Sequence, residues 1–172
     1  MTIRKAVPEE AQIIITFYHD LIDTMKDRPI RPTWVKGVYP TLDDIREAAD
    51  NGWLNIAVLD DGSIAGAVVV NNRQGKCYDE VDWAINTAAV AVIHLLASAP
   101  RLHGQGIGRK LLERARETAR EMKADVIRLD TLPYNIPARR LYESFGFQYR
   151  GDIDLFYPSA GTIPFSMHEY VL

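Results

Sequence analysis

A run of glycines on alternate residues constrains this chain most, because it joins an apolar strand to an amphipathic helix. The stretch HLLASAPRLHGQGIGRKLL begins at His94. Its glycines are Gly104, Gly106 and Gly108. Arg109 and Lys110 follow at the helix start, where the partial positive charge of the N-terminus disfavours them. A strand, a glycine-rich turn and a helix N-terminus together can hold phosphate through backbone N–H groups, so we expect an anion here.

The spacing of these glycines disfavours two common nucleotide-binding motifs. In the dinucleotide fingerprint G-x-G-x-x-G the third glycine comes one position later than Gly108 does. A P-loop has a lysine and then a hydroxyl residue after its last glycine, whereas Arg109 follows Gly108. A tight connection alone needs only one or two glycines, and each extra one costs roughly 0.5–1 kcal/mol. An extended diphosphate, spread over several N–H groups, accounts for the glycines and the cations together.

The composition is that of a globular domain without a strongly charged surface. The chain has 172 residues, 47% of them hydrophobic, and a formal net charge of -3, which suits one domain and gives no basic field for nucleic acid. Its one cysteine, Cys77, can form neither an internal disulfide nor a thiolate metal site by itself. The most apolar stretch, residues 84–99, contains polar residues and is shorter than the roughly 18 apolar residues of a membrane span. We therefore expect a cytoplasmic protein that needs no metal, nucleic acid or membrane.

Hydrophobic periodicity predicts helices and strands in alternation. The expected helices run from Glu9 to about Lys26, from a cap at Thr41 to Gly52, from Gly106 to Lys123, and from a cap at Asn135 to Gly146. The expected strands are residues 2–7, two strands around an Asp-Gly turn within 53–72, then 89–98, 125–131, 145–151 and 163–172. Residues 73–88 show no clear pattern. The order β-α-α-β-β-β-α-β-α-β-β predicts one α/β (α+β) domain over residues 1–172, with a mixed sheet flanked by helices.

The glycine stretch resembles the pyrophosphate loop of the GNAT superfamily of acetyl-CoA-dependent N-acetyltransferases. The family pattern Gln/Arg-x-x-Gly-x-Gly/Ala aligns with residues 103–108, with His103 where the family usually has Gln or Arg. The strand before Pro100 resembles the family's fourth strand, whose backbone pairs with the pantetheine arm of coenzyme A. A second segment, NIPARRLYESFGF from Asn135 to Phe147, is similar to the family element Asn-x-x-Ala-x-x-x-Tyr-x-x-x-Gly-Phe.

This resemblance implies a mostly antiparallel sheet and acetyl-CoA as cosubstrate. The residues that it implies for cofactor binding are Leu96, Ala97, Ser98, His103, Gly104, Gln105, Gly106, Ile107, Gly108, Arg109, Asn135, Ala138 and Tyr142.

The resemblance also implies direct attack of an amine on the thioester in a ternary complex. Tyr142 is then the candidate acid for the departing sulfur, since a phenol with a pKa of about 10 is protonated at neutral pH, although packing in the core would also explain it. The donor to the carbonyl oxygen is expected to be a backbone N–H near Ala97 or Ser98, at a break in strand pairing. His94 and Glu80 are the candidate bases. A hydrogen-bonded core histidine and a solvated charged loop explain these two residues equally well.

Aromatic residues in the expected loops are the candidates for the acceptor pocket. They are Trp34 and Tyr39, then Tyr78 and Trp83 beside Asp79, Glu80 and Asp82, and finally Phe156 and Tyr157 in the expected loop of residues 152–165. The expected acceptor is a primary amine of a small molecule or peptide. A hydroxyl acceptor, a longer acyl group, a non-catalytic acyl-CoA-binding module and a homodimer remain open alternatives.

Overall fold

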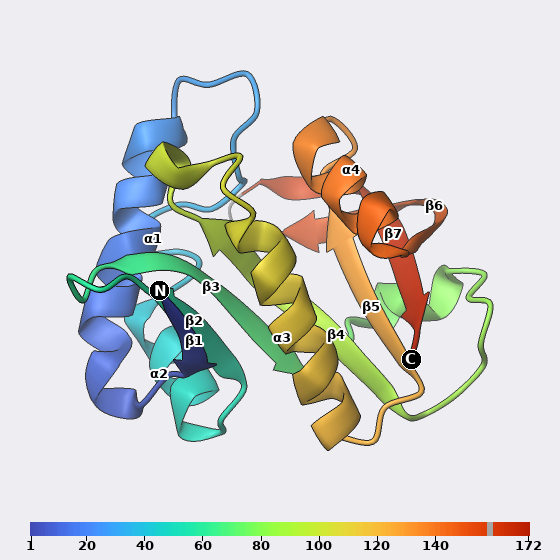
Figure 1. Cartoon of the computed structure of the whole chain (residues 1–172). Coiled ribbons are helices and arrows are strands. Elements are labelled where there is room, and N and C mark those ends of the chain that lie inside the picture. The colour runs from blue at the N-terminus through green and yellow to red at the C-terminus, as the bar shows by residue number, and fades with distance from the viewer. Residues whose placement is uncertain (158–159) are drawn as a thin grey trace.

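The fold is a single twisted sheet with helices on both faces (Figure 1). The computed structural model describes residues 1–157 and 160–172. The strands are β1 Thr2–Lys5, β2 Leu54–Val58, β3 Ile64–Asn71, β4 Val90–Ser98, β5 Val126–Thr131, β6 Gln148–Tyr157 and β7 Gly161–Val171. The helices are α1 Ala11–Met25, α2 Leu42–Asp50, α3 Ile107–Glu121 and α4 Ile136–Phe145, with 3-10 turns η1 Pro8–Glu10, η2 Lys76–Glu80 and η3 Pro100–Leu102. The predicted order of helices and strands is confirmed.

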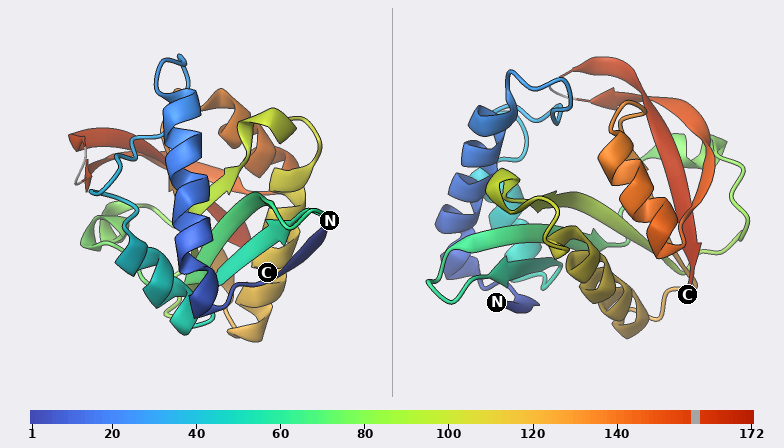
Figure 2. Two further views of the ribbon diagram at one scale, coloured as in Figure 1. Left: turned by 90° about the vertical axis from the view of Figure 1, so that its left-hand side faces the viewer. Right: turned by 45° about the horizontal axis from the view of Figure 1, so that its top comes forward.

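The sheet is mixed and mostly antiparallel, as expected. Its strand order is β1-β2-β3-β4-β5-β7-β6, and β4 and β5 form the one parallel pair among the described strands. Figure 2 shows α1 and α2 on one side of the sheet and α3 and α4 on the other. Each helix pair buries its apolar stripe against the sheet, which gives a separate core on each face. No helix of the described residues is long and apolar enough to cross a membrane.

The predicted helix caps are confirmed. Thr41 Oγ1 accepts a hydrogen bond from the backbone N–H of Asp44, whose carboxylate accepts one from the Thr41 N–H in return. Asn135 Oδ1 accepts from the N–H of Ala138 at the start of α4. Gly146 ends α4 at a φ of 113°, which a residue without a side chain adopts readily.

The expected loop between the last two strands is wrong in its extent. Pairing of β6 with β7 continues from Asp152 opposite Ser166 to Tyr157 opposite Gly161, so most of residues 152–165 is strand. Ile153 and Leu155 face the core while Asp152 and Asp154 are exposed, which is the alternation of a half-buried strand. Residues 158–159 of that stretch lie outside the described residues.

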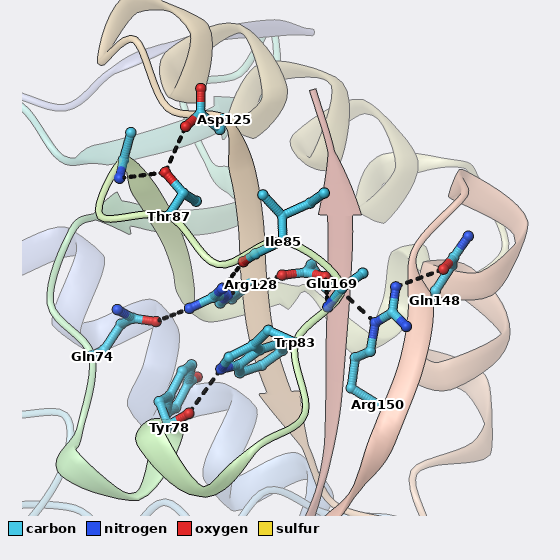
Figure 3. A network of polar contacts seen from close by, with 12 residues as sticks. Gln74, Tyr78, Trp83, Ile85, Thr87, Asp125, Arg128, Gln148, Arg150 and Glu169 are labelled. Atoms are coloured by element: carbon cyan, nitrogen blue, oxygen red, sulfur yellow. Dashed lines mark hydrogen bonds and ion pairs between the residues drawn. The ribbon is translucent and has the colours of Figure 1, made fainter.

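The segment 73–88, which has no clear sequence pattern, is held against the sheet by a buried ion pair. Arg128 of β5 and Glu169 of β7 lie opposite each other and are joined by an Nε–Oε1 contact of 3.2 Å. The Arg128 guanidinium also donates to Gln74 Oε1 and to the Ile85 carbonyl, and the Glu169 carboxylate accepts from the Ala84 N–H (Figure 3). Two side chains of the sheet thus anchor both ends of a segment with little regular structure.

Candidate active site

β4 and β5 separate halfway along their length. Their pairing covers only Val90–Val92 with Val126–Arg128, although β4 continues to Ser98 and β5 to Thr131. The N–H of Ala99, directly after β4, donates to the Ala65 carbonyl of β3, and backbone groups of successive strand residues alternate in direction. The peptide groups of Leu96 and Ser98 therefore turn away from β3, toward the space where β5 has diverged. An extended ligand can pair with this free edge as an added strand does.

A β-bulge marks the beginning of this free edge. The register with β3 shifts between His94 and Ala97, and Leu95 has a φ of +52°, which a branched side chain rarely adopts. The break in strand pairing therefore lies at Leu95 and Leu96, slightly before the expected position at Ala97 or Ser98. Tyr18 of α1 donates a hydrogen bond of 2.7 Å to the Leu95 carbonyl. The extra residue reverses the alternation of side chains, so Leu95 and Ala97 join the core under α1.

The glycine loop leaves a row of backbone donors without partners. Gly104 and Gly106 have φ values of 82° and 78°, in the region that favours glycine. Among the described residues of this loop and of the first turn of α3, five backbone N–H groups make no hydrogen bond. They belong to Gly104, Gly106, Ile107, Gly108 and Arg109. Together with the positive end of α3, this row is suited to an extended anion.

Three residues at the two ends of this loop also have contacts that do not involve a ligand. A side chain at Gly108 would come within 2.9 Å of Leu141 Cδ2, so the contact between α3 and α4 is a second reason for that glycine. The His103 ring lies 3.3 Å from the Ser98 carbonyl oxygen, at the end of the free edge. Arg109 is half exposed and lies 3.6 Å from Glu113, an intrahelical pair that offsets part of its unfavourable place in the helix.

Tyr142 lies on the α4 side of the sheet, in the core formed by α3 and α4. Its ring is 6% exposed and packs against Phe147 and His168, with ring centroids 5.9 Å away in each case. Burial raises the pKa of its phenol, and the negative charge of Asp130 raises it further. The hydroxyl makes no hydrogen bond to any residue that the structure describes, so it remains available as a donor.

A cluster of polar side chains lies on the opposite face of the sheet, around Asp130 of β5. Tyr78 of η2 donates a hydrogen bond of 2.6 Å to the Asp130 carboxylate, which is half-buried. Burial raises the pKa of Asp130 and lowers that of His94, and each group partly counteracts the shift of the other. His94 Nε2 lies 3.1 Å from the Arg73 carbonyl oxygen. His94 and Asp130 thus face each other across the separation of β4 and β5.

Three of the aromatic residues predicted for the acceptor pocket meet beside this polar cluster. Trp34 Nε1 donates to the Tyr157 hydroxyl at 3.1 Å, and the Tyr39 and Tyr157 rings meet edge to face at 5.6 Å. The charge of Asp130 contributes to raising the pKa of Tyr39 and of Tyr157, after the larger effect of burial. The 27–41 loop and β6 therefore form an aromatic wall next to Asp130.

Other predicted residues lie apart from that wall. Phe156 is 75% exposed. Glu80 of η2 is exposed, as are Asp79 before it and Asp82 two residues after the end of η2. The Arg128 guanidinium lies over the Trp83 ring, 4.2 Å from the ring centroid. Trp83 thus packs against the Arg128–Glu169 pair that holds segment 73–88, which we call the clamp.

Sequence reasoning missed Asp130 and Tyr18. A signal for Asp130 was present, because a carboxylate within the apolar strand VIRLDT needs a partner when it is buried. Tyr18 gave no such signal, since it shares the apolar stripe of α1 and its hydroxyl contact depends on the bulge. No group of three or more potential ligands that could hold a metal occurs among the described residues.

This chain is similar in sequence to known acetyltransferases. The family described as "Acetyltransferase (GNAT) family" matches residues 16–147. A mycothiol acetyltransferase of Beutenbergia cavernae is 31% identical over 107 residues, which are 62% of this chain and 34% of that protein. The chain thus spans about a third of the length of that relative.

Solved structures share the fold over nearly the whole chain. An acetyltransferase of the GNAT family from Streptococcus agalactiae superposes with a TM-score of 0.81 at 20% identity, covering 99% of this chain and 95% of that one. The protein yncA from Salmonella typhimurium, solved with its cofactor acetyl-CoA, superposes with a TM-score of 0.72 at 17% identity, covering 99% of this chain and 93% of that one.

Proposed function

Because the chain belongs to the GNAT acetyltransferase family, we propose that it transfers the acetyl group of acetyl-CoA to a primary amine of a small molecule or peptide. The observation that carries this proposal is the row of unpartnered N–H groups between Gly104 and Arg109, at the end of the free edge of β4. An anionic cosubstrate with a long polar arm matches both features. Acetyl-CoA has a diphosphate for the loop and a pantetheine amide chain for the strand edge.

Two parts of acetyl-CoA match two sets of backbone groups in this chain. The diphosphate is bound by the N–H groups of Gly104 to Arg109, with the positive end of α3 adding to the attraction. The pantetheine arm pairs with the peptide groups of Leu96 and Ser98. Acetyl-CoA supplies an activated acyl group with a good leaving sulfur.

The side chains on the two faces of the sheet divide the proton transfers. On one face His94 takes a proton from the acceptor ammonium, and the free nitrogen lone pair forms the new N–C bond. The C–S bond breaks, and the sulfur keeps its electron pair and takes the phenol proton of Tyr142 from the other face. The second proton of the nitrogen returns to the phenol through solvent, and one proton per turnover is released. Backbone N–H groups at the bulge stabilise the carbonyl oxygen during attack.

Two alternative functions need different features of the site. A non-catalytic acyl-CoA-binding module has no use for a hydroxyl donor such as Tyr142 at the sulfur, although a structural role in the core accounts for its ring. A transferase for longer acyl groups needs depth beyond the bulge, and the core side chains of Leu95 and Ala97 fill the α1 side there. The first observation favours catalysis over binding alone, and the second favours a short acyl group.

The first test measures thermal stability with coenzyme A, acetyl-CoA, NAD and ATP. Coenzyme A and acetyl-CoA should both stabilise the protein, by about 2.7 kcal/mol at a concentration 100 times the dissociation constant. NAD and ATP should have much smaller effects. The release of free thiol with a panel of primary amines then tests acetyl transfer directly. Stabilisation without transfer to any amine would support the binding module instead.

A further inference from the structure

The carboxylate of Asp130 is half-buried and forms no ion pair with any residue that the structure describes. Its one hydrogen bond in the described part of the chain comes from the neutral hydroxyl of Tyr78. Arg128 points to the same face two residues earlier, but its guanidinium is engaged by Glu169, Gln74 and the Ile85 carbonyl. The arginine nearest in the strand therefore leaves Asp130 unpaired.

Among residues 1–157 and 160–172, the titratable side chains that interact with Asp130 supply no permanent positive charge. The titratable side chains whose pKa responds to the Asp130 charge are Tyr39, Cys77, Tyr78, His94, Tyr142 and Tyr157. They come from the 27–41 loop, η2, β4, α4 and β6, so the carboxylate is surrounded on several sides. Five of them are neutral at physiological pH, and burial lowers the pKa of His94, which favours its neutral form as well.

Such a carboxylate gains most from a cationic ligand. A buried charge is costly unless it is paired, and Tyr78 contributes only one neutral hydrogen bond. The neighbouring rings of Trp34, Tyr39 and Tyr157 offer apolar surface and π-electron density, both of which suit an alkylammonium group. Asp130 also lies across the β4–β5 separation from His94, the proposed proton acceptor.

We propose that Asp130 binds the ammonium group of the acceptor, that the carbon chain of the acceptor lies against Trp34, Tyr39 and Tyr157, and that the acceptor has no carboxylate next to its amine. This inference rests on the proposed acetyltransferase function and specifies its substrate class. Asp130 orients the nitrogen between His94 and the thioester carbonyl, while Tyr78 fixes the position of the carboxylate.

The absence of a carboxylate on the acceptor follows from the cations of the surrounding elements. An α-amino acid would need a second, positive site beside Asp130. Arg73 is paired with Glu47 at 2.8 Å and lies over the Trp53 ring, and Lys36 of the 27–41 loop is paired with Asp23. With Arg128 in the clamp, each of these three cations has another partner. Arg28 and Arg31 of the 27–41 loop and Lys76 of η2 are exposed, and the pKa of Asp130 responds to none of them. A simple alkylamine, or the side-chain amine of a larger molecule, fits the remaining charge.

Three probes of nearly equal shape test this proposal by binding. Pentylamine, pentanol and norleucine share a linear carbon chain and differ in the cation or in an added α-carboxylate. Each is titrated into the free protein and into the coenzyme A complex, with protein NMR shifts as the readout. We expect pentylamine to bind roughly 10- to 100-fold more tightly than pentanol or norleucine, as a charge-assisted hydrogen bond allows.

Matched variants locate the binding to one carboxylate. Asp130→Asn should remove the preference for pentylamine over pentanol, and Tyr78→Phe should reduce it while keeping the ring. Asp152→Asn is the control, because Asp152 also accepts a 2.6 Å hydrogen bond from a hydroxyl, that of Ser166, outside this site. It should leave the preference unchanged. If Asp130→Asn does not fold, Tyr78→Phe gives the same comparison.

The outcomes separate this inference from the proposed function. Equal binding of pentylamine and pentanol, tighter binding of norleucine, or an unchanged preference in both variants would overturn the role of Asp130. Acetyl transfer to amines by the wild-type protein would then still support the proposed function. Conversely, a protein that prefers pentylamine through Asp130 but neither binds coenzyme A nor acetylates amines would contradict the proposed function alone.

Discussion

The hydroxyl of Tyr18 donates a hydrogen bond to the carbonyl of Leu95, so that α1 holds the bulge of β4 in place. Tyr18 is fully buried, and Leu95 has the unusual φ of +52°. A backbone strained in this way persists only where its surroundings determine it. The contact therefore links a helix on the proposed acceptor side of the sheet to the strand edge proposed to bind acetyl-CoA.

Removal of the Tyr18 hydroxyl should weaken both stability and cosubstrate binding. Tyr18→Phe leaves the Leu95 carbonyl without its donor, and a buried unsatisfied acceptor costs about 1–3 kcal/mol. Urea unfolding measures that cost, and calorimetry measures the accompanying fall in coenzyme A affinity. Tyr134→Phe, at a 49% exposed residue, is the control and should change neither quantity. A Tyr18→Phe protein with unaltered stability and affinity would show that the bulge needs no support from α1.

Gly106 and Gly108 should respond differently to substitution. A valine at Gly106 has room for its Cβ but must adopt a φ near 78° and projects beside the unpartnered N–H groups, so coenzyme A affinity should fall sharply. Gly108→Ala instead brings a Cβ to 2.9 Å from Leu141, so its main effect should be on the unfolding midpoint. Calorimetry and thermal unfolding of both variants separate the two effects. Normal coenzyme A binding by Gly106→Val would rule out this loop as the diphosphate site.

Local patterns in the sequence were sufficient for most of the fold. The caps at Thr41 and Asn135 were predictable because a capping side chain and its partner lie within three residues of each other. The outer half of β6 was not recognised, because the alternation of polar and apolar residues lasts only from Asp152 to Leu155 and is then broken by Phe156. An edge strand with a polar outer face resembles a loop in composition.

The site was predictable only where one segment contains it. The glycine loop is contiguous, whereas Tyr78 and Asp130 meet across 52 residues of sequence. Their contact depends on the clamp that Arg128 and Glu169 place on segment 73–88, and no local periodicity encodes that clamp. Gly108 is a similar case, because the need for a glycine there comes partly from the close approach of Leu141 on α4.

Breaking the Arg128–Glu169 pair should be strongly destabilising. Both side chains are nearly or fully buried, and among the described residues Arg128→Met leaves the Glu169 carboxylate with only Arg150 at 3.4 Å as a charged partner. Removing one partner of a buried ion pair typically costs about 3–5 kcal/mol, which urea unfolding will show. Arg46→Met removes an exposed pair with Asp43 and should cost less than about 1 kcal/mol. Equal effects of the two substitutions would mean that the clamp contributes no more than a surface pair.

Loss of His94 should affect activity most at low pH. Burial lowers the pKa of His94, so the imidazole stays neutral and able to accept a proton below its ordinary range, while Asp130 opposes that shift. The wild-type kcat/KM should therefore fall only when the pH drops through this lowered pKa. Without the base, His94→Gln must wait for solvent to deprotonate the amine, so the ratio of wild-type to variant kcat/KM should be largest in acid and shrink as the pH rises. A ratio that is constant with pH would assign His94 a structural role.

Tyr142→Phe distinguishes an enzyme from a binding module. The substitution keeps the ring contacts with Phe147 and His168 and removes only the hydroxyl, so the free energy of unfolding and coenzyme A affinity should barely change. If the phenol protonates the departing sulfur, kcat should fall by about 10²–10⁴-fold, the usual range for general acid catalysis. Burial and the charge of Asp130 both raise the pKa of Tyr142, so the phenol keeps its proton at any pH used in the assay and the loss should appear across the whole profile. Tyr170→Phe, in the same core, is the control for loss of a ring hydroxyl and should retain full turnover. Full kcat in Tyr142→Phe, measured with an amine that the wild-type protein acetylates, would show that the ring is core packing and that the sulfur leaves without this acid.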